Sequence, residues 1–271
     1  MNAFKSFAAK HPVLFVLGSI IAWLVLAMVF AGITSSALGR PYEDALTIGR
    51  LGVTICCLLL IWRLGWLKMS GITSSGNWAV WLIVLGSLTY FTSGSLFSFY
   101  GEVAFDFSSL IRLPDARTAV IGHLMAGLSE EILFRGLVLC ALSRAWGNTK
   151  WGVTGSIVLT SLLFAVLHIM QVATGGLSLP LALLLILETF VISFWWGVVV
   201  LFGGSIWPAV VLHFVGNAVV AVQGLTGTMI TPIILAYERI LWFSIPLGML
   251  GIGLLIQILR RLGRSFEQGA N

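Results

Sequence analysis

Long apolar runs, separated by short polar stretches, account for most of the chain. About 20 mostly apolar residues are needed for a helix to cross the hydrocarbon core of a bilayer. The pattern therefore predicts an all-α, polytopic membrane protein, with residues 1–271 forming a single integral membrane domain. We expect a bundle of eight transmembrane helices, at 12–33, 45–67, 78–100, 118–142, 151–170, 180–202, 205–224 and 240–260. Only "GGS" separates the sixth and seventh runs, which predicts a tight antiparallel hairpin.

The composition supports this interpretation and excludes other classes. Hydrophobic residues make up 59% of the chain and charged residues 9%, whereas about a quarter of the residues in a soluble domain are charged. The net charge of +5 is spread along the chain without a basic run, so we expect no nucleic-acid partner. The three cysteines lie in apolar segments and are expected to be free thiols.

Basic residues predict the orientation in the membrane, because cytoplasmic loops carry an excess of Lys and Arg. The loops on one predicted side, with both chain ends, hold nine of them, and the loops on the other side hold four. Both termini are therefore expected to be cytoplasmic. The nine are Lys5, Lys10, Arg63, Lys68, Arg144, Lys150, Arg260, Arg261 and Arg264.

Three charged residues interrupt the fourth apolar run, in the stretch "SEEILFRG". Facing lipid, they would together cost on the order of 8–10 kcal/mol, so they must face the bundle interior or a wet cavity. Arg135 follows Glu131 by four residues, which places both on one helix face and predicts an ion pair. Glu130 points about 100° away from Glu131 and lacks that partner, which suits a general base.

Other polar residues occur in the fifth and seventh runs. His213 and Asn217 share one face of the seventh run, and His168 lies near the end of the fifth. With Glu130, they supply one carboxylate, two imidazoles and one amide, which could activate a water and polarise a carbonyl group. The same set could instead bind Zn²⁺ through Glu130, His168 and His213, leaving one position open. The absence of HExxH and the poor ligand quality of Asn217 favour a site without an obligatory metal.

Three motifs resemble those of a known family. "EEILFRG" fits E-E-x-x-x-R, "FAVLH" fits F-x-x-x-H, and "HFVGN" fits H-x-x-x-N, in that order. This resembles the CPBP family, which includes the CAAX prenyl endopeptidase Rce1, the bacterial Abi proteins and bacteriocin-processing or immunity proteins. The motifs lie within a predicted core at 118–224.

The resemblance implies an intramembrane endopeptidase with a defined set of roles. Glu130 would activate the attacking water with help from His168, and His213 and Asn217 would stabilise the oxyanion. Supporting residues would be Glu131, Arg135 and Phe164, the last packing beneath His168. The expected substrate is a membrane-associated or lipidated peptide or protein, of the CAAX type or a bacterial peptide. The stretch "SIWPAVVLHFVGN" resembles bacterial members, so we expect a bacterial plasma membrane.

Two functions of other classes remain open. A non-catalytic immunity or peptide-binding membrane protein could use the same fold and the same polar residues. A transporter could use Glu188, Glu130 and His213 as a proton relay, but the sequence shows none of the internal repeats or paired broken helices typical of such proteins.

Overall fold

The computed structural model describes residues 3–39, 42–96, 116–170, 178–225 and 244–268. All regular secondary structure in these ranges is helical. The helices are α1 (Ala3–Lys10), α2 (Pro12–Leu38), α3 (Tyr42–Arg63), α4 (Trp78–Leu96), α6 (Ala116–Glu131), the π-helix η1 (Ile132–Leu139), α7 (Cys140–Trp146), α8 (Lys150–Val166), the 3₁₀ turn η2 (Leu167–Ile169), α10 (Leu179–Gly203), α11 (Trp207–Leu225) and α13 (Ile245–Gln268).

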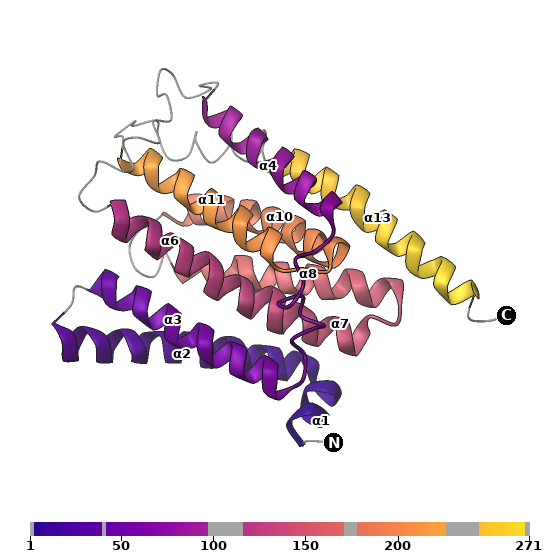
Figure 1. Ribbon diagram of the computed structural model, residues 1–271, viewed down its shortest axis with the longest axis horizontal. Coiled ribbons are helices and arrows are strands. Elements are labelled where there is room, and N and C mark those ends of the chain that lie inside the picture. The colour runs from indigo at the N-terminus through magenta and orange to yellow at the C-terminus, as the bar shows by residue number, and fades with distance from the viewer. Residues whose placement is uncertain (1–2, 40–41, 97–115, 171–177, 226–243, 269–271) are drawn as a thin grey trace.

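The helices form an elongated bundle, with α2 and α3 side by side along one edge (Figure 1). The opposite edge is formed by α4 and α13, and α6, α8, α10 and α11 lie between the two edges (Figure 1). The predicted hairpin at residues 180–224 is confirmed, because α10 and α11 pack together across a short turn. The all-α prediction is also confirmed for the described residues.

The count of eight spans is not confirmed. Five described helices are long and apolar enough to cross a bilayer: Pro12–Leu38, Asp44–Arg63, Lys150–Ile169, Leu179–Gly203 and Ile245–Leu262. The apolar part of α4 within the described residues is shorter, Trp78–Leu88. The run predicted at 118–142 contains three charged residues in its centre, and the run at 205–224 forms α11, a helix of 19 residues.

The second predicted span ends earlier than expected, at Arg63 instead of residue 67. Gly65 adopts a left-handed conformation, with φ of 68°. Its N–H donates to the Trp62 carbonyl, and the N–H of Trp66 donates to the Ile61 carbonyl. These two bonds form a Schellman motif, in which a left-handed glycine ends a helix. The apolar residues that follow therefore belong to a turn, although their hydropathy suggested a longer helix.

The π-helix η1 forms the centre of the core. All eight of its residues are buried, and it contacts α2, α3, α6, α7, α8 and α10. Because all of its sides are buried, other helices enclose η1 on every side. Arg135 lies in the middle of η1 and is only 1% exposed. The outer helices instead expose large apolar side chains, for example Ile21 and Met28 on α2 and Met249 on α13, as expected of surfaces in contact with lipid.

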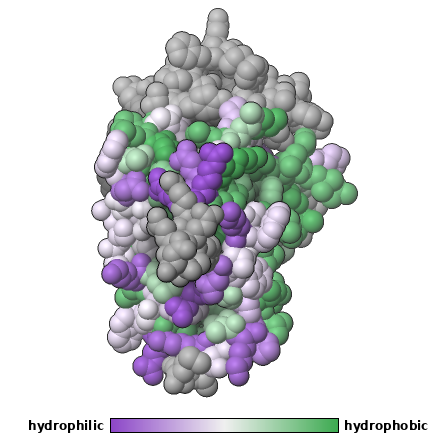
Figure 2. All heavy atoms as spheres, turned by 90° about the vertical axis from the view of Figure 1, so that its right-hand side faces the viewer, coloured by the Kyte–Doolittle hydropathy of each residue, from purple (hydrophilic) through white to green (hydrophobic). Residues whose placement is uncertain are grey.

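One end of the bundle carries both α1 and the last turns of α13 (Figure 1). Hydrophilic side chains gather on this end, which faces the viewer in Figure 2. Basic residues from distant parts of the chain meet here. The Arg144 guanidinium lies 5.5 Å from the centroid of the Trp66 ring, and that of Arg261 lies 5.2 Å from Phe202.

The segment between α3 and α4 is tied to the α10–α11 turn at this same end. Ser205 Oγ donates to the Ser74 carbonyl at 2.5 Å, and Trp207 Nε1 donates to the Ile72 carbonyl at 2.9 Å. Asn77 Nδ2 donates to the Phe202 carbonyl at 3.3 Å. These bonds connect residues more than 100 positions apart in the sequence, so they hold the N-terminal helices against the central ones.

Candidate active site

The ion pair predicted on the fourth apolar run is confirmed. Arg135 Nη1 lies 2.9 Å from Glu131 Oε1, and both side chains are fully buried. Arg135 Nη2 donates to the carbonyl oxygen of Ser193 at 3.1 Å and to its Oγ at 2.8 Å. The guanidinium also lies 5.0 Å from the centroid of Phe164 and 5.3 Å from that of Trp196. A buried cation is tolerated when it is paired in this way.

His213 joins the two glutamates. Its Nδ1 lies 2.9 Å from Glu131 Oε1, the same oxygen that binds Arg135. Its Nε2 lies 3.7 Å from Glu130 Oε2. Because an ionised carboxylate only accepts hydrogen bonds, Nδ1 carries the proton and Nε2 is directed toward Glu130. Glu131 therefore holds both the cation on its own helix and the imidazole on α11.

Close contact between α6 and α11 brings these residues together. Gly127 lies less than one turn before Glu130, and a Cβ at this position would lie 3.3 Å from the Phe214 nitrogen and 3.6 Å from His213 Cγ. A larger side chain would therefore push the two helices apart. The glycine in "MAGLSEE" allows the backbone of α11 to approach and places His213 within reach of both carboxylates.

Phe164 connects the two histidines. Its ring centroid lies 5.2 Å from that of His168 and 5.8 Å from that of His213, with an edge-to-face geometry in both cases. The predicted contact between Phe164 and His168 is thus confirmed. His168 Nδ1 lies 3.1 Å from the carbonyl oxygen of Phe164, and because a carbonyl only accepts, this nitrogen donates. In the neutral ring, Nε2 then has a free lone pair.

Asn217 lies on α11, one turn after His213, and its side chain is half-buried. Its spacing of four residues places it on the His213 face of the helix, as predicted. The structure thus positions the four candidate catalytic residues on three helical segments: Glu130 on α6, His168 on η2, and His213 and Asn217 on α11.

The candidate metal-binding set is not formed. In the described part of the chain, no three His, Cys, Asp or Glu side chains are grouped so that they could hold a metal ion. Glu130 and His213 lie close together, but His168 is oriented by the backbone of its own helix, whereas His213 is oriented by Glu131. We therefore assign no step of the chemistry to a metal.

The sequence did not identify Ser193 and Trp196 as parts of the site. Both lie on α10, three residues apart, in the apolar stretch "VISFWWG". Ser193 accepts two hydrogen bonds from Arg135, and the Trp196 ring stacks on His213 with centroids 4.5 Å apart. A buried serine one turn before a tryptophan is a weak signal, because both residue types are common in transmembrane helices.

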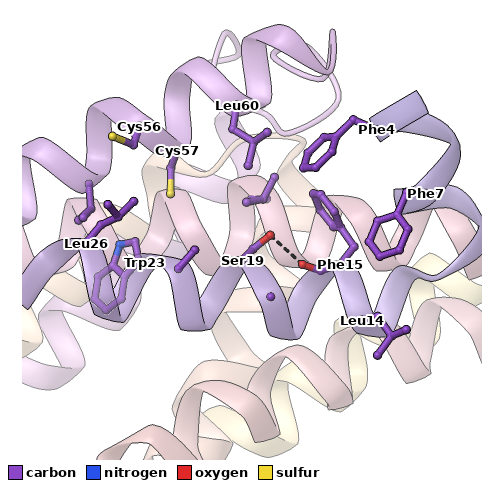
Figure 3. Close-up of a pocket in the computed structure, with 14 residues that line it drawn as sticks. Phe4, Phe7, Leu14, Phe15, Ser19, Trp23, Leu26, Cys56, Cys57 and Leu60 are labelled. Carbon is purple, nitrogen blue, oxygen red and sulfur yellow. Dashed lines mark hydrogen bonds between the residues drawn. The ribbon is translucent and has the colours of Figure 1, made fainter. Parts of the chain in front are cut away.

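One cavity in the described part of the chain has no charged side chain in its lining. It measures about 380 Å³ and lies between α1, α2, α3 and η1. Apolar side chains line nearly all of it, including Phe4, Phe15 and Trp23 (Figure 3). The hydroxyl of Ser19 is already bonded to the Phe15 carbonyl on its own helix. The cavity fits a hydrocarbon chain, and the candidate catalytic residues do not line it.

Comparison with known proteins gives one match. Residues 114–219 match the family described as type II CAAX prenyl endopeptidase Rce1-like. The matched segment runs from just before α6 into α11 and contains every candidate catalytic and supporting residue. No curated protein and no solved structure matches the chain.

Proposed function

We propose that this protein is an intramembrane endopeptidase, because residues 114–219 match the Rce1-like family. It hydrolyses a peptide bond of a membrane-associated or lipidated peptide or protein, of the CAAX type or a bacterial peptide. The hydrogen bond from His213 to Glu131 is the observation that best supports this proposal. It directs the second nitrogen of the imidazole toward Glu130 in a buried site.

Glu130 acts as the general base in this mechanism. Its carboxylate takes a proton from a water molecule, and the resulting hydroxide attacks the carbonyl carbon of the scissile bond. His168 Nε2, which has a free lone pair, accepts a hydrogen bond from the same water and orients it. When the tetrahedral intermediate collapses, the C–N bond breaks and Glu130 returns the proton to the leaving amine.

His213 and Asn217 stabilise the oxyanion. During the reaction, Nδ1–H of His213 donates to Glu131, and Nε2–H donates to the developing oxyanion. The Asn217 amide, one turn further along α11, supplies a second donor. Such prearranged donors are worth more in a dry site than in water.

We further propose that the protein resides in a bacterial plasma membrane with both termini in the cytoplasm. The distribution of basic residues supports this orientation. The apolar outer surfaces of α2 and α13 are consistent with a bilayer around the bundle.

Peptide cleavage by purified protein in nanodiscs tests the proposed activity. The substrates are fluorogenic peptides with prenylated and unprenylated C-termini. Glu130→Gln removes the base with little change in shape, and we expect it to lower kcat on the order of 10²–10⁴-fold. Asp44→Asn makes the same chemical change near the start of α3 and is expected to retain activity.

Cleavage that is equal in wild type and Glu130→Gln would indicate a contaminant or a different active site. A lack of cleavage by well-folded wild-type protein would favour the peptide-binding or immunity function instead.

A further inference from the structure

Another cavity borders Arg135 of the candidate active site, at the basic end of the bundle. It measures about 280 Å³ and is enclosed by the segment after α3, by η1 and α7, and by the end of α10. Arg135, Ser143 and Arg144 all line it. Arg144 is exposed and Arg135 is 1% exposed, so the lining includes both a surface arginine and a buried one.

The lining of this cavity contains cations and no anion. Arg135 and Arg144 line it, and none of the described lining residues is acidic, although Glu131 pairs with Arg135 from outside the lining. Arg144 Nη1 donates to the thioether sulfur of Met69 at 3.0 Å, and such a sulfur is a weak acceptor. The strong acceptors near Arg135, on Glu131 and Ser193, are bound to its two terminal nitrogens.

Two of the described residues that line the cavity carry a buried donor without a partner. Within the described residues, the buried Nε of Arg135 and the buried Oγ of Ser143 have no hydrogen-bond partner. Leaving a buried polar group unpaired is costly, and the cost is larger for a charged group. Arg135 and Ser143 are eight residues apart along η1 and α7, and both residues line this cavity.

We propose that this cavity binds a phosphate-type oxyanion. Arg144 supplies the charge at the exposed end, and Ser143 Oγ and Arg135 Nε donate to the oxygens further in. Guanidinium groups recognise phosphate oxygens through charge-assisted hydrogen bonds. The source is either the headgroup of an anionic phospholipid or free phosphate. The bound anion is connected to His213 by three successive hydrogen bonds, between the anion and Arg135, between Arg135 and Glu131 and between Glu131 and His213, but its binding does not depend on the proposed proteolysis.

Thermal unfolding of the full-length protein tests this site. The protein is placed in nanodiscs of phosphatidylcholine, and Tm is followed by tryptophan fluorescence. In one arm, inorganic phosphate is titrated at constant ionic strength with chloride as the balancing anion. In the other, part of the phosphatidylcholine is replaced by phosphatidylglycerol. We expect a saturable rise in Tm in at least one arm, because a ligand that binds the folded state stabilises it. The responding arm identifies the source.

Matched variants locate the binding. Arg144→Gln is expected to weaken the apparent affinity about tenfold or more. Arg63→Gln removes the same charge from an exposed position at the end of α3, outside the cavity, and is expected to retain the response. If Arg144→Gln does not fold, Ser143→Ala, which removes only a hydroxyl, is expected to weaken binding several-fold. The proposal is wrong if neither arm raises Tm, or if the Arg144 and Arg63 variants lose the response equally.

Discussion

A single carboxylate oxygen, Oε1 of Glu131, accepts hydrogen bonds from both Arg135 and His213. The neighbouring Glu130 is 21% exposed and lies 3.7 Å from His213. Two adjacent glutamates therefore have different environments, and we assign them different tasks. Glu131 orients the imidazole and compensates the buried guanidinium, whereas Glu130 remains available to a water molecule.

This difference predicts contrasting effects of two isosteric changes. Glu131→Gln is expected to lower kcat on the order of 10²–10⁴-fold, because His213 loses its charged acceptor. It should also destabilise the protein by about 3–5 kcal/mol, because Arg135 becomes a buried charge without a compensating anion. Glu130→Gln should lower kcat and leave Tm nearly unchanged. Peptide cleavage and thermal unfolding of both variants check this, and equal Tm losses would contradict the assignment.

The sequence predicted the contact within one helix, between Glu131 and Arg135, but not the contacts that this pair makes with other helices. Glu131 and Arg135 are four residues apart on one helix, so their pairing follows from helix geometry alone. The bond from His213 to Glu131 spans 82 positions and depends on how α6 packs against α11. Ser193 and Trp196 depend in the same way on the packing of α10, which no spacing within one helix reports.

At the level of helices, Phe164 lies where four segments meet. Its ring contacts Phe134 on η1, His168 on η2, Trp196 on α10 and His213 on α11. One side chain on α8 therefore fixes the distances between helices that carry the candidate catalytic groups.

Truncating this side chain should affect stability and activity together. Phe164→Ala is expected to cost about 3–5 kcal/mol, because a large buried ring is lost and a cavity remains. Activity should fall as well, since both histidines lose the ring that holds them. Leu162→Ala is the control on the same helix, because Leu162 is 46% exposed. Thermal unfolding and cleavage rates measure both effects, and similar losses in the two variants would disprove the role of Phe164.

The pairing of α2 with α3 depends on a glycine that allows close backbone contact. A Cβ on Gly49 would lie 2.8 Å from the Ala27 carbonyl oxygen and 3.1 Å from the Ala31 nitrogen. These atoms belong to the backbone and cannot move without shifting a helix. Gly32 on α2 has no atom within 4 Å of its Cβ position.

Two glycine-to-alanine changes should therefore have opposite effects. Gly49→Ala is expected to destabilise the protein by about 1–3 kcal/mol, through steric overlap at the helix contact. Gly32→Ala should stabilise it by about 0.5–1 kcal/mol, because alanine favours the helix. Thermal unfolding measures both effects. The Tm of Gly49→Ala should lie below that of wild type, and the Tm of Gly32→Ala should lie above it. A fall in Tm for both variants would contradict the expectation that Gly32 tolerates a methyl group.

The sequence predicted most helices but not their local deviations. Long apolar runs located the five described helices that are long and apolar enough to cross a bilayer. Hydropathy did not reveal that residues 132–139 form a π-helix, which depends on packing around the helix. Nor did it give the end of α3, because the Schellman turn at Gly65 lies within an apolar stretch.

For the whole molecule, the positions of α1 and the end of α13 predict the topology. Both lie at the end of the bundle where hydrophilic side chains gather (Figures 1 and 2). Reporter fusions at the N-terminus and at the C-terminus should therefore give the same result, and a cytoplasmic one. A fusion pair that reports opposite sides would contradict an even number of spans.

The bonds between the segment after α3 and the α10–α11 turn also bear on how the chain is made. Ile72, Ser74 and Asn77 are tied to Phe202, Ser205 and Trp207. During synthesis, α2 and α3 leave the ribosome long before Trp207 does. The segment after α3 therefore lacks its hydrogen-bond partners until more than 120 further residues have been translated. The N-terminal half can therefore reach its final position only late in synthesis. In a chain released before Trp207, the backbone carbonyls of Ile72 and Ser74 would lack these partners, and quality-control proteases could recognise the exposed segment.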